Sequence, residues 1–136
     1  MKGIVYITGV SENRDRDEYF EALGRKVEQG GYTPFIPHKS TNRGEMEEKE
    51  YEHNMEMLKK ASLVIAYLGA PSFDVGMELQ VANDHQVPIV GFYPTGVEPK
   101  RMILKLPMLK QTFEYRNEFT ALQWVNCFML DYASSK

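Results

Sequence analysis

Two carboxylates, Asp74 and Glu78, are separated by four positions just after a short apolar segment. Apolar residues recur around them at roughly helical spacing, which predicts that the pair shares one face of the first two turns of a helix. An acid pair at a helix start suggests chemistry, but dipole complementarity and solvation also explain such a pair. From the spacing alone, the structural interpretation carries more weight. The apolar residues concerned are Phe73, Met77, Leu79 and Ala82.

The segment 62–68 (SLVIAYL) has to position this pair. It is almost uninterruptedly apolar and β-branched in its middle, as in a strand that is buried on both faces of a parallel sheet. The run ends at 69–72 (GAPS), so a central strand is expected to pass into the helix across a tight turn, with Ser72 near the helix start. In open α/β sheets, ligands bind outside the carboxyl ends of the strands.

The rest of the chain alternates between strand-like and helix-like segments. This alternation predicts a single α/β domain over residues 1–136, with a doubly wound five-stranded parallel sheet and the flavodoxin-like order 2-1-3-4-5. Pro34 favours an outer position for the second strand, because proline cannot donate to the ladder. The expected strands are 3–8, 32–37, 62–68, 87–93 and 109–115, and the expected helices are 16–29, 46–61, the one after Ser72, 100–106 and 117–132.

Composition narrows the choice of partner. Sixteen basic and nineteen acidic residues give a net charge of −3, which argues against a nucleic-acid polymer or an anionic membrane and favours a small molecule. The sequence shows no signal peptide and no apolar run approaching the roughly eighteen residues of a membrane span, so a cytoplasmic protein is expected. Cys127, the single cysteine, is expected in the core of the last helix. No metal-ligand cluster is visible.

Two nucleotide-binding motifs are missing. No G-x-G-x-x-G follows the first strand and no G-x-x-x-x-G-K-[ST] occurs, so neither a standard dinucleotide site nor a P-loop is predicted. The central strand also ends without a carboxylate, which argues against receiver-domain phosphorylation. The acid pair therefore remains the main candidate for chemistry.

The stretch 71–82 (PSFDVGMELQVA) resembles the signature of the nucleoside 2-deoxyribosyltransferase superfamily, particularly its small branch of 2'-deoxynucleoside 5'-phosphate N-hydrolases. The resemblance covers most of the chain, including an opening strand with Tyr6 and Gly9 and a helix that ends in 54–61 (NMEMLKKA). It implies cleavage of the N-glycosidic bond of a nucleoside or nucleoside 5'-monophosphate, by hydrolysis or base transfer, without a metal or organic cofactor. It also implies a homodimer, for which Met102, Ile103, Leu106 and Met108 offer an apolar surface, although core packing is the more common use of such residues.

The resemblance assigns roles to individual residues. Glu78 would attack C1' of the sugar, and Tyr6 would orient it. The 5'-phosphate would be held by three loops at the carboxyl edge, and His38 would lie on the base side. The resemblance places Gly9, Ser72 and Gly76 in substrate binding together with His38. Three further candidates depart from the family pattern: Ser11 stands one place after the family's serine position, and Lys100 and Arg101 stand where the hydrolases carry small polar residues. Basic residues can still bind a phosphate, although a solvated helix end explains these two nearly as well.

Asn54 departs from the family pattern, because relatives carry an aspartate there that assists departure of the base. Asparagine can hydrogen-bond a base but cannot deliver that proton, so Asp74 is the candidate substitute. Two classes of function follow. The first is a glycosidase or transferase that uses Glu78, and the second is a non-catalytic nucleotide-binding module on the same fold in which Asn54 marks lost chemistry.

Overall fold

The computed structural model describes residues 2–9, 14–37 and 48–134. Strands and helices alternate along these residues, and each predicted strand is present, although two of them are shorter at both ends than predicted. The strands are β1 (Ile4–Thr8), β2 (Thr33–Phe35), β3 (Leu63–Tyr67), β4 (Ile89–Pro94) and β5 (Leu109–Tyr115). The helices are α1 (Arg14–Gln29), α3 (Glu48–Lys59), α4 (Phe73–Asp84), α5 (Arg101–Leu104) and α6 (Glu118–Ser134).

The five strands form one sheet in the order β2-β1-β3-β4-β5, and every neighbouring pair is parallel. The predicted flavodoxin-like topology is thereby confirmed, with β3 in the centre and the strand that contains Pro34 at an edge. All five residues of β3 are buried, because helices cover both faces of the sheet. Its uniformly apolar sequence is the physical consequence of this position.

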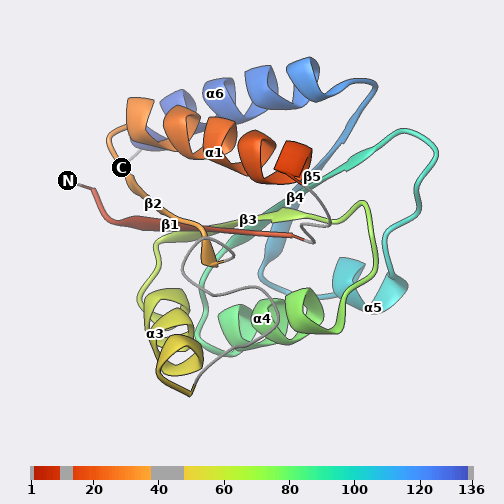
Figure 1. Ribbon diagram of the computed structural model, residues 1–136. Coiled ribbons are helices and arrows are strands. Elements are labelled where there is room, and N and C mark those ends of the chain that lie inside the picture. The colour runs from red at the N-terminus through yellow and green to blue at the C-terminus, as the bar shows by residue number, and fades with distance from the viewer. Residues whose placement is uncertain (1, 10–13, 38–47, 135–136) are drawn as a thin grey trace.

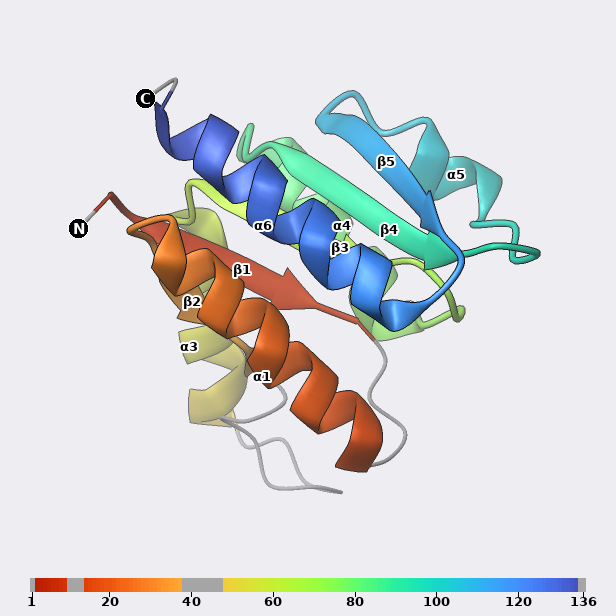
Figure 2. The same ribbon diagram turned by 90° about the horizontal axis from the view of Figure 1, so that it is seen from above.

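Two apolar layers hold the helices to the sheet. On one face, α1 and α6 lie side by side, as Figures 1 and 2 show from two directions. On the other face lie α3, α4 and α5 (Figure 1). Successive residues of a strand point to opposite faces, so β1 sends Val5 and Ile7 into the first layer and Tyr6 into the second.

One core prediction is wrong. Cys127 is exposed, because α6 turns Val125 and Met129 toward the sheet and Cys127 away from it. The apolar composition of the helix gave no indication of this, since α6 also carries exposed apolar residues such as Phe119 and Leu130.

Candidate functional site

Glu78 lies in the first two turns of α4, where two side chains of β1 hold its carboxylate. The hydroxyl group of Tyr6 donates a hydrogen bond to Oε2, and the hydroxyl group of Thr8 donates one to Oε1 at 2.6 Å. Tyr6 and Thr8 are both buried. The carboxylate is therefore fixed in orientation by a donor on each oxygen, which is an arrangement suited to a positioned nucleophile.

The alternation of β1 explains why these two donors converge. Tyr6 and Thr8 are two residues apart and so point to the same face of the sheet, which is the face covered by α4. Tyr6 was predicted from the resemblance, whereas Thr8 was not predicted. Two features of the sequence could have identified Thr8. It is two positions after Tyr6 and therefore shares its face of the strand, and it is the last residue of a strand that ends at the ligand-binding edge.

The electrostatics of this cluster depend mainly on burial. Burial raises the pKa of Glu78, the hydrogen bonds from Thr8 and Tyr6 lower it in part, and the negative charge of Asp74 adds to the increase. For Tyr6, burial and then the charge of Glu78 raise the pKa far above its ordinary value. Tyr6 therefore stays protonated near neutral pH and keeps its role as a donor.

Asp74 and Gly76 belong to the same first turns of α4. Asp74 is exposed, and its negative charge is near enough to Glu78 to raise the pKa of that residue. At Gly76, apart from its chain neighbours and the backbone of its own helix, no atom of the described residues lies within 4 Å of the position that a Cβ would occupy, so open space adjoins this part of the helix. The helix start thus offers a partly buried carboxylate, a second exposed carboxylate and room for a ligand.

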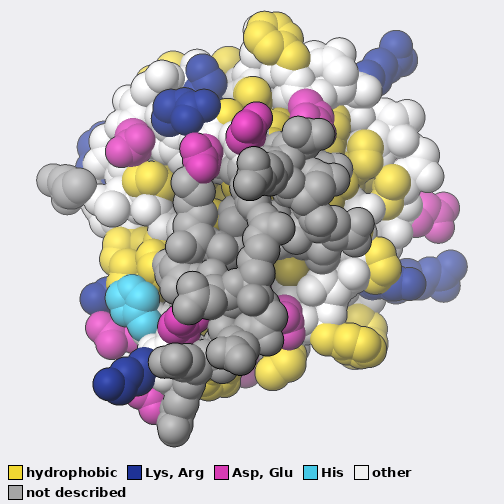
Figure 3. All heavy atoms as spheres, viewed as in Figure 1, with side chains coloured by type: hydrophobic (Ala, Val, Ile, Leu, Met, Phe, Trp, Pro, Cys, Tyr) yellow, Lys and Arg dark blue, Asp and Glu magenta, His cyan; other side chains and the backbone are white. Residues whose placement is uncertain are grey.

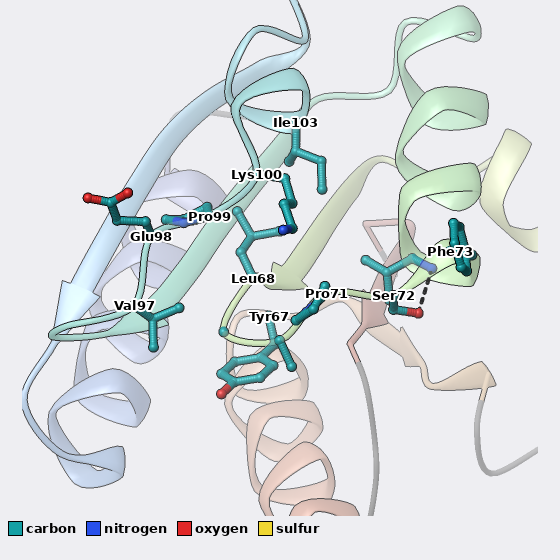
Figure 4. A pocket seen from close by; sticks show the side chains of 13 residues that line it. Tyr67, Leu68, Pro71, Ser72, Phe73, Val97, Glu98, Pro99, Lys100 and Ile103 are labelled. Atoms are coloured by element: carbon teal, nitrogen blue, oxygen red, sulfur yellow. Dashed lines mark hydrogen bonds between the residues drawn. The ribbon is translucent and has the colours of Figure 1, made fainter.

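A pocket of about 500 Å³ lies beside the start of α4, between the loop after β3 and the loop after β4. Ser72 and Lys100 line it from these two loops, and the Glu98 carboxylate points away from its centre (Figure 4). Ser72 is the N-cap of α4, and its Oγ accepts a hydrogen bond from the backbone N–H of Val75 at 3.3 Å. Its hydroxyl hydrogen remains available to a ligand. A hydroxyl donor, a helix N-terminus and a lysine are suited to binding an anion.

The remaining predicted ligand residues have different positions. Arg101 begins α5 and is exposed, but it is not one of the residues that line the pocket. Gly9 follows β1, and a Cβ there would lie 2.7 Å from Phe20 Cζ and from Tyr67 Cβ, so packing already requires a glycine. Ser11 and His38 lie outside the described residues.

Asn54 is on α3, and only 3% of its surface is exposed. Its burial fits a position in the second apolar layer, since Leu58 lies one turn further along the same helix face and belongs to that layer. Residues 2–9, 14–37 and 48–134 contain no group of three or more His, Cys, Asp or Glu side chains that could hold a metal ion. In the same ranges, no helix has the length and apolar character needed to cross a membrane.

Several solved structures share the fold of this chain. The CMP N-glycosidase BcmB of Clostridium botulinum superimposes with a TM-score of 0.72 at 17% identity, over 92% of this chain and 98% of that chain. A 2-deoxyribosyltransferase from Bacillus psychrosaccharolyticus gives 0.68 at 17% identity, over 93% and 95% of the two chains. A flavodoxin from the domain Archaea gives 0.60 at 11% identity, over 97% of each chain. No protein-family model and no curated protein sequence matches this chain.

These similarities establish the fold. The same topology serves a glycosidase, a transferase and a flavodoxin, so the function has to be argued from the site itself.

Proposed function

We propose that this protein cleaves the N-glycosidic bond of a nucleoside 5'-monophosphate or nucleoside, with Glu78 as the nucleophile. The observation that carries this proposal is the Glu78 carboxylate, which is held by Tyr6 and Thr8 at the carboxyl edge of the sheet. The fold shared with a CMP N-glycosidase and with 2-deoxyribosyltransferases supports the same choice, as does the sequence resemblance of 71–82 to that superfamily.

The reaction follows from the position of the carboxylate. An oxygen of Glu78 attacks C1' of the sugar, the bond from C1' to the base nitrogen breaks, and the base leaves with the bonding electrons and takes up a proton. Water then attacks C1' and releases the sugar from Glu78, or a second base does so and forms a new nucleoside. Tyr6 and Thr8 hold the carboxylate in place for the first step and stabilise it when the second step regenerates it.

The neighbouring pocket gives the substrate a second attachment. Ser72, the N-terminal backbone of α4 and Lys100 would bind the 5'-phosphate, which places the sugar over the start of α4. Binding energy from the phosphate can then position C1' against Glu78. Nucleoside 5'-monophosphates are accordingly the preferred substrate class.

A substrate panel tests the proposed function. The protein is incubated with ribo- and deoxyribonucleosides and with their 5'-monophosphates, and free base is measured by chromatography. Base release that depends on protein concentration supports the proposal. If no compound releases base but several bind, the chain is the non-catalytic nucleotide-binding module, which is the alternative considered from the sequence.

Asp74→Asn is expected to shift the acidic limb of the pH profile to lower pH. The first step needs ionised Glu78, so activity falls as the pH drops through the pKa of that residue. Because the charge of Asp74 raises this pKa, its removal lowers it and activity persists to lower pH. If Asp74 also protonates the departing base, the rate at neutral pH should fall about a hundredfold. The measurement is kcat/KM against pH.

Asp84→Asn is the matched control, since Asp84 ends the same helix and is exposed. It lies six residues from Glu78, about 9 Å along the helix axis, which is about one Debye length at physiological salt, whereas Asp74 is one helical turn away and is the charge that raises the pKa of Glu78. Its pH profile should match that of the wild type. An acidic limb that stays in place in Asp74→Asn, or that moves to higher pH, would contradict the prediction.

The homodimer also belongs to this proposal. Of the four residues expected at its interface, Ile103, Leu106 and Met108 pack against the core and Met102 is 86% exposed. Phe73 is 95% exposed, and Met77 on the next turn of α4 is 61% exposed. Apolar and basic side chains lie together over α5 and the start of α4 in Figure 3. An exposed apolar surface beside a pocket is typical of a protein interface.

Light scattering at micromolar concentration is expected to give twice the chain mass of 15.7 kDa for the wild type. Met102→Glu should give a mass close to that of one chain, because a buried carboxylate without a partner disfavours association. Leu130→Glu is the control, since Leu130 is exposed on α6, across the sheet from α5. A monomeric wild type would rule out the dimer.

A further inference from the structure

Two buried oxygen atoms on α3 have no hydrogen-bond partner within residues 2–9, 14–37 and 48–134. They are Oε2 of Glu50 and Oδ1 of Asn54. The two residues are four positions apart, so they share one face of the helix. Buried polar atoms in native proteins are nearly always paired, and each exception calls for an explanation such as a bound ligand. Both atoms are hydrogen-bond acceptors, so a ligand group with N–H donors could supply the partners that they lack.

The face that carries Glu50 and Asn54 is turned toward the candidate site. Leu58 continues this face and is buried in the same layer as Tyr6 and Leu79. Helix α3 packs against α4 and also contacts β1, the strand that carries Tyr6 and Thr8. Glu50 and Asn54 lie in the first two turns of α3, as Asp74 and Glu78 lie in the first two turns of α4.

A chain of aromatic contacts connects this part of α3 to the nucleophile. The ring of His53, adjacent to Asn54, lies 5.4 Å from the ring of Phe35. The ring of Phe35 lies 5.4 Å from the ring of Tyr6, whose hydroxyl group binds Glu78. This chain of contacts places the turn of α3 that contains His53 and Asn54 beside Phe35, the last residue of β2, which is the neighbour of Tyr6 in the sheet.

In the sheet, the pocket and the Glu78 carboxylate lie at different strands, so they would contact different parts of one substrate. Ser72 and Lys100 flank the pocket after β3 and β4, whereas Glu78 is bound by side chains of β1. Since neighbouring strands lie about 4.8 Å apart, a nucleotide with its phosphate in the pocket can reach Glu78 with C1' and extend its base toward α3. The acceptors on α3 then lie where the base would be.

We infer that Glu50 and Asn54 bind the exocyclic amino group of the base and make the protein selective for amino-bearing bases. This inference rests on the proposed function. An amino group supplies two N–H donors, which match the two unpartnered acceptors. A base with a carbonyl at that position places an acceptor against both oxygens, leaves them unsatisfied and is rejected.

Matched nucleotides that differ only in this group test the inference. Cytidine and uridine 5'-monophosphate form one pair, and adenosine and inosine 5'-monophosphate form another. Binding is measured by calorimetry on Glu78→Ala protein, so that no turnover interferes. In at least one pair, the amino-bearing nucleotide is expected to bind at least about tenfold more tightly. Equal affinity within both pairs, or preference for the carbonyl member, overturns the inference.

Variants of α3 assign the selectivity to these residues. Asn54→Leu and Glu50→Leu in the same background should bring the affinity ratio close to one. Glu50→Gln keeps the shape and converts an acceptor into a possible donor, so it should shift preference toward the carbonyl member and remains informative if a leucine variant fails to fold. Glu52→Gln is the matched control, because Glu52 is exposed on the same helix, and it should keep the wild-type ratio. An unchanged ratio in Glu50→Gln and Asn54→Leu overturns the inference.

The outcomes separate this inference from the proposed function. Selective binding of amino-bearing nucleotides without base release by the wild type would leave the amino selectivity in place and reject the glycosidase. Base release at equal rates from both members of each pair would support the glycosidase and reject the selectivity.

Discussion

Glu78→Ala is expected to reduce base release by about 10⁴-fold or more, because removal of a nucleophile removes the step that breaks the glycosidic bond. Substrate binding should change much less, since the phosphate is held in the pocket lined by Ser72 and Lys100. The measurement is kcat and KM for the best substrate of the panel, with free base quantified by chromatography.

Glu78→Gln separates the nucleophile from its packing. The amide has nearly the shape of the carboxylate and can still bind Tyr6 and Thr8, but it is a much weaker nucleophile. It should therefore fold as the wild type does and lose activity as Glu78→Ala does. Wild-type turnover in either variant would reject Glu78 as the nucleophile.

Lys100→Ala is expected to lower the preference for monophosphates over nucleosides by about ten- to a hundredfold, the range of one charge-assisted hydrogen bond. The physical reason is the position of Lys100 in the pocket, opposite the N-cap Ser72 (Figure 4). Ser72→Ala is less suitable, because it also removes the cap of α4. The measurement is kcat/KM for a nucleoside and for its 5'-monophosphate.

Two further variants calibrate the effect of Lys100. Arg101→Ala should have the smaller effect of the two neighbours, since Arg101 does not line the pocket. Lys105→Ala changes another exposed lysine at the end of α5 and should leave the preference unchanged. Equal losses in Lys100→Ala and Lys105→Ala would indicate general electrostatic attraction and would remove the phosphate site.

The central strand of the sheet could be predicted from the sequence, because a strand that is buried on both faces has apolar residues at every position. Residues 62–68 are apolar without alternation, and β3 is the central strand. Pro34 likewise predicted an edge strand, because proline has no backbone N–H to donate to a neighbouring strand. The surface was harder to predict. Phe73 and Met77 follow a helical apolar pattern and yet are exposed, because periodicity identifies a face without showing what covers it.

The site depends on contacts between distant parts of the chain. Thr8 and Glu78 are seventy positions apart, and their hydrogen bond follows from the pairing of β1 with β3 and the packing of α4 beneath them. A resemblance could assign Glu78 and Tyr6, but it assigned nothing to Thr8. Glu50 could not be singled out from the sequence either, since a glutamate in a helix rich in Glu and Lys is ordinarily solvated. Only the burial of its Oε2 atom in the structure distinguishes it.

Mass spectrometry of a trapped intermediate tests the central claim most directly. A nucleoside 5'-monophosphate with fluorine at C2' disfavours the positively charged transition states and allows the sugar-bound protein to accumulate. The account predicts that the protein gains the mass of the sugar phosphate, that peptide mapping places it on Glu78, and that Glu78→Gln gains nothing. An adduct on another residue, or release of base with no adduct in the wild type, would contradict it.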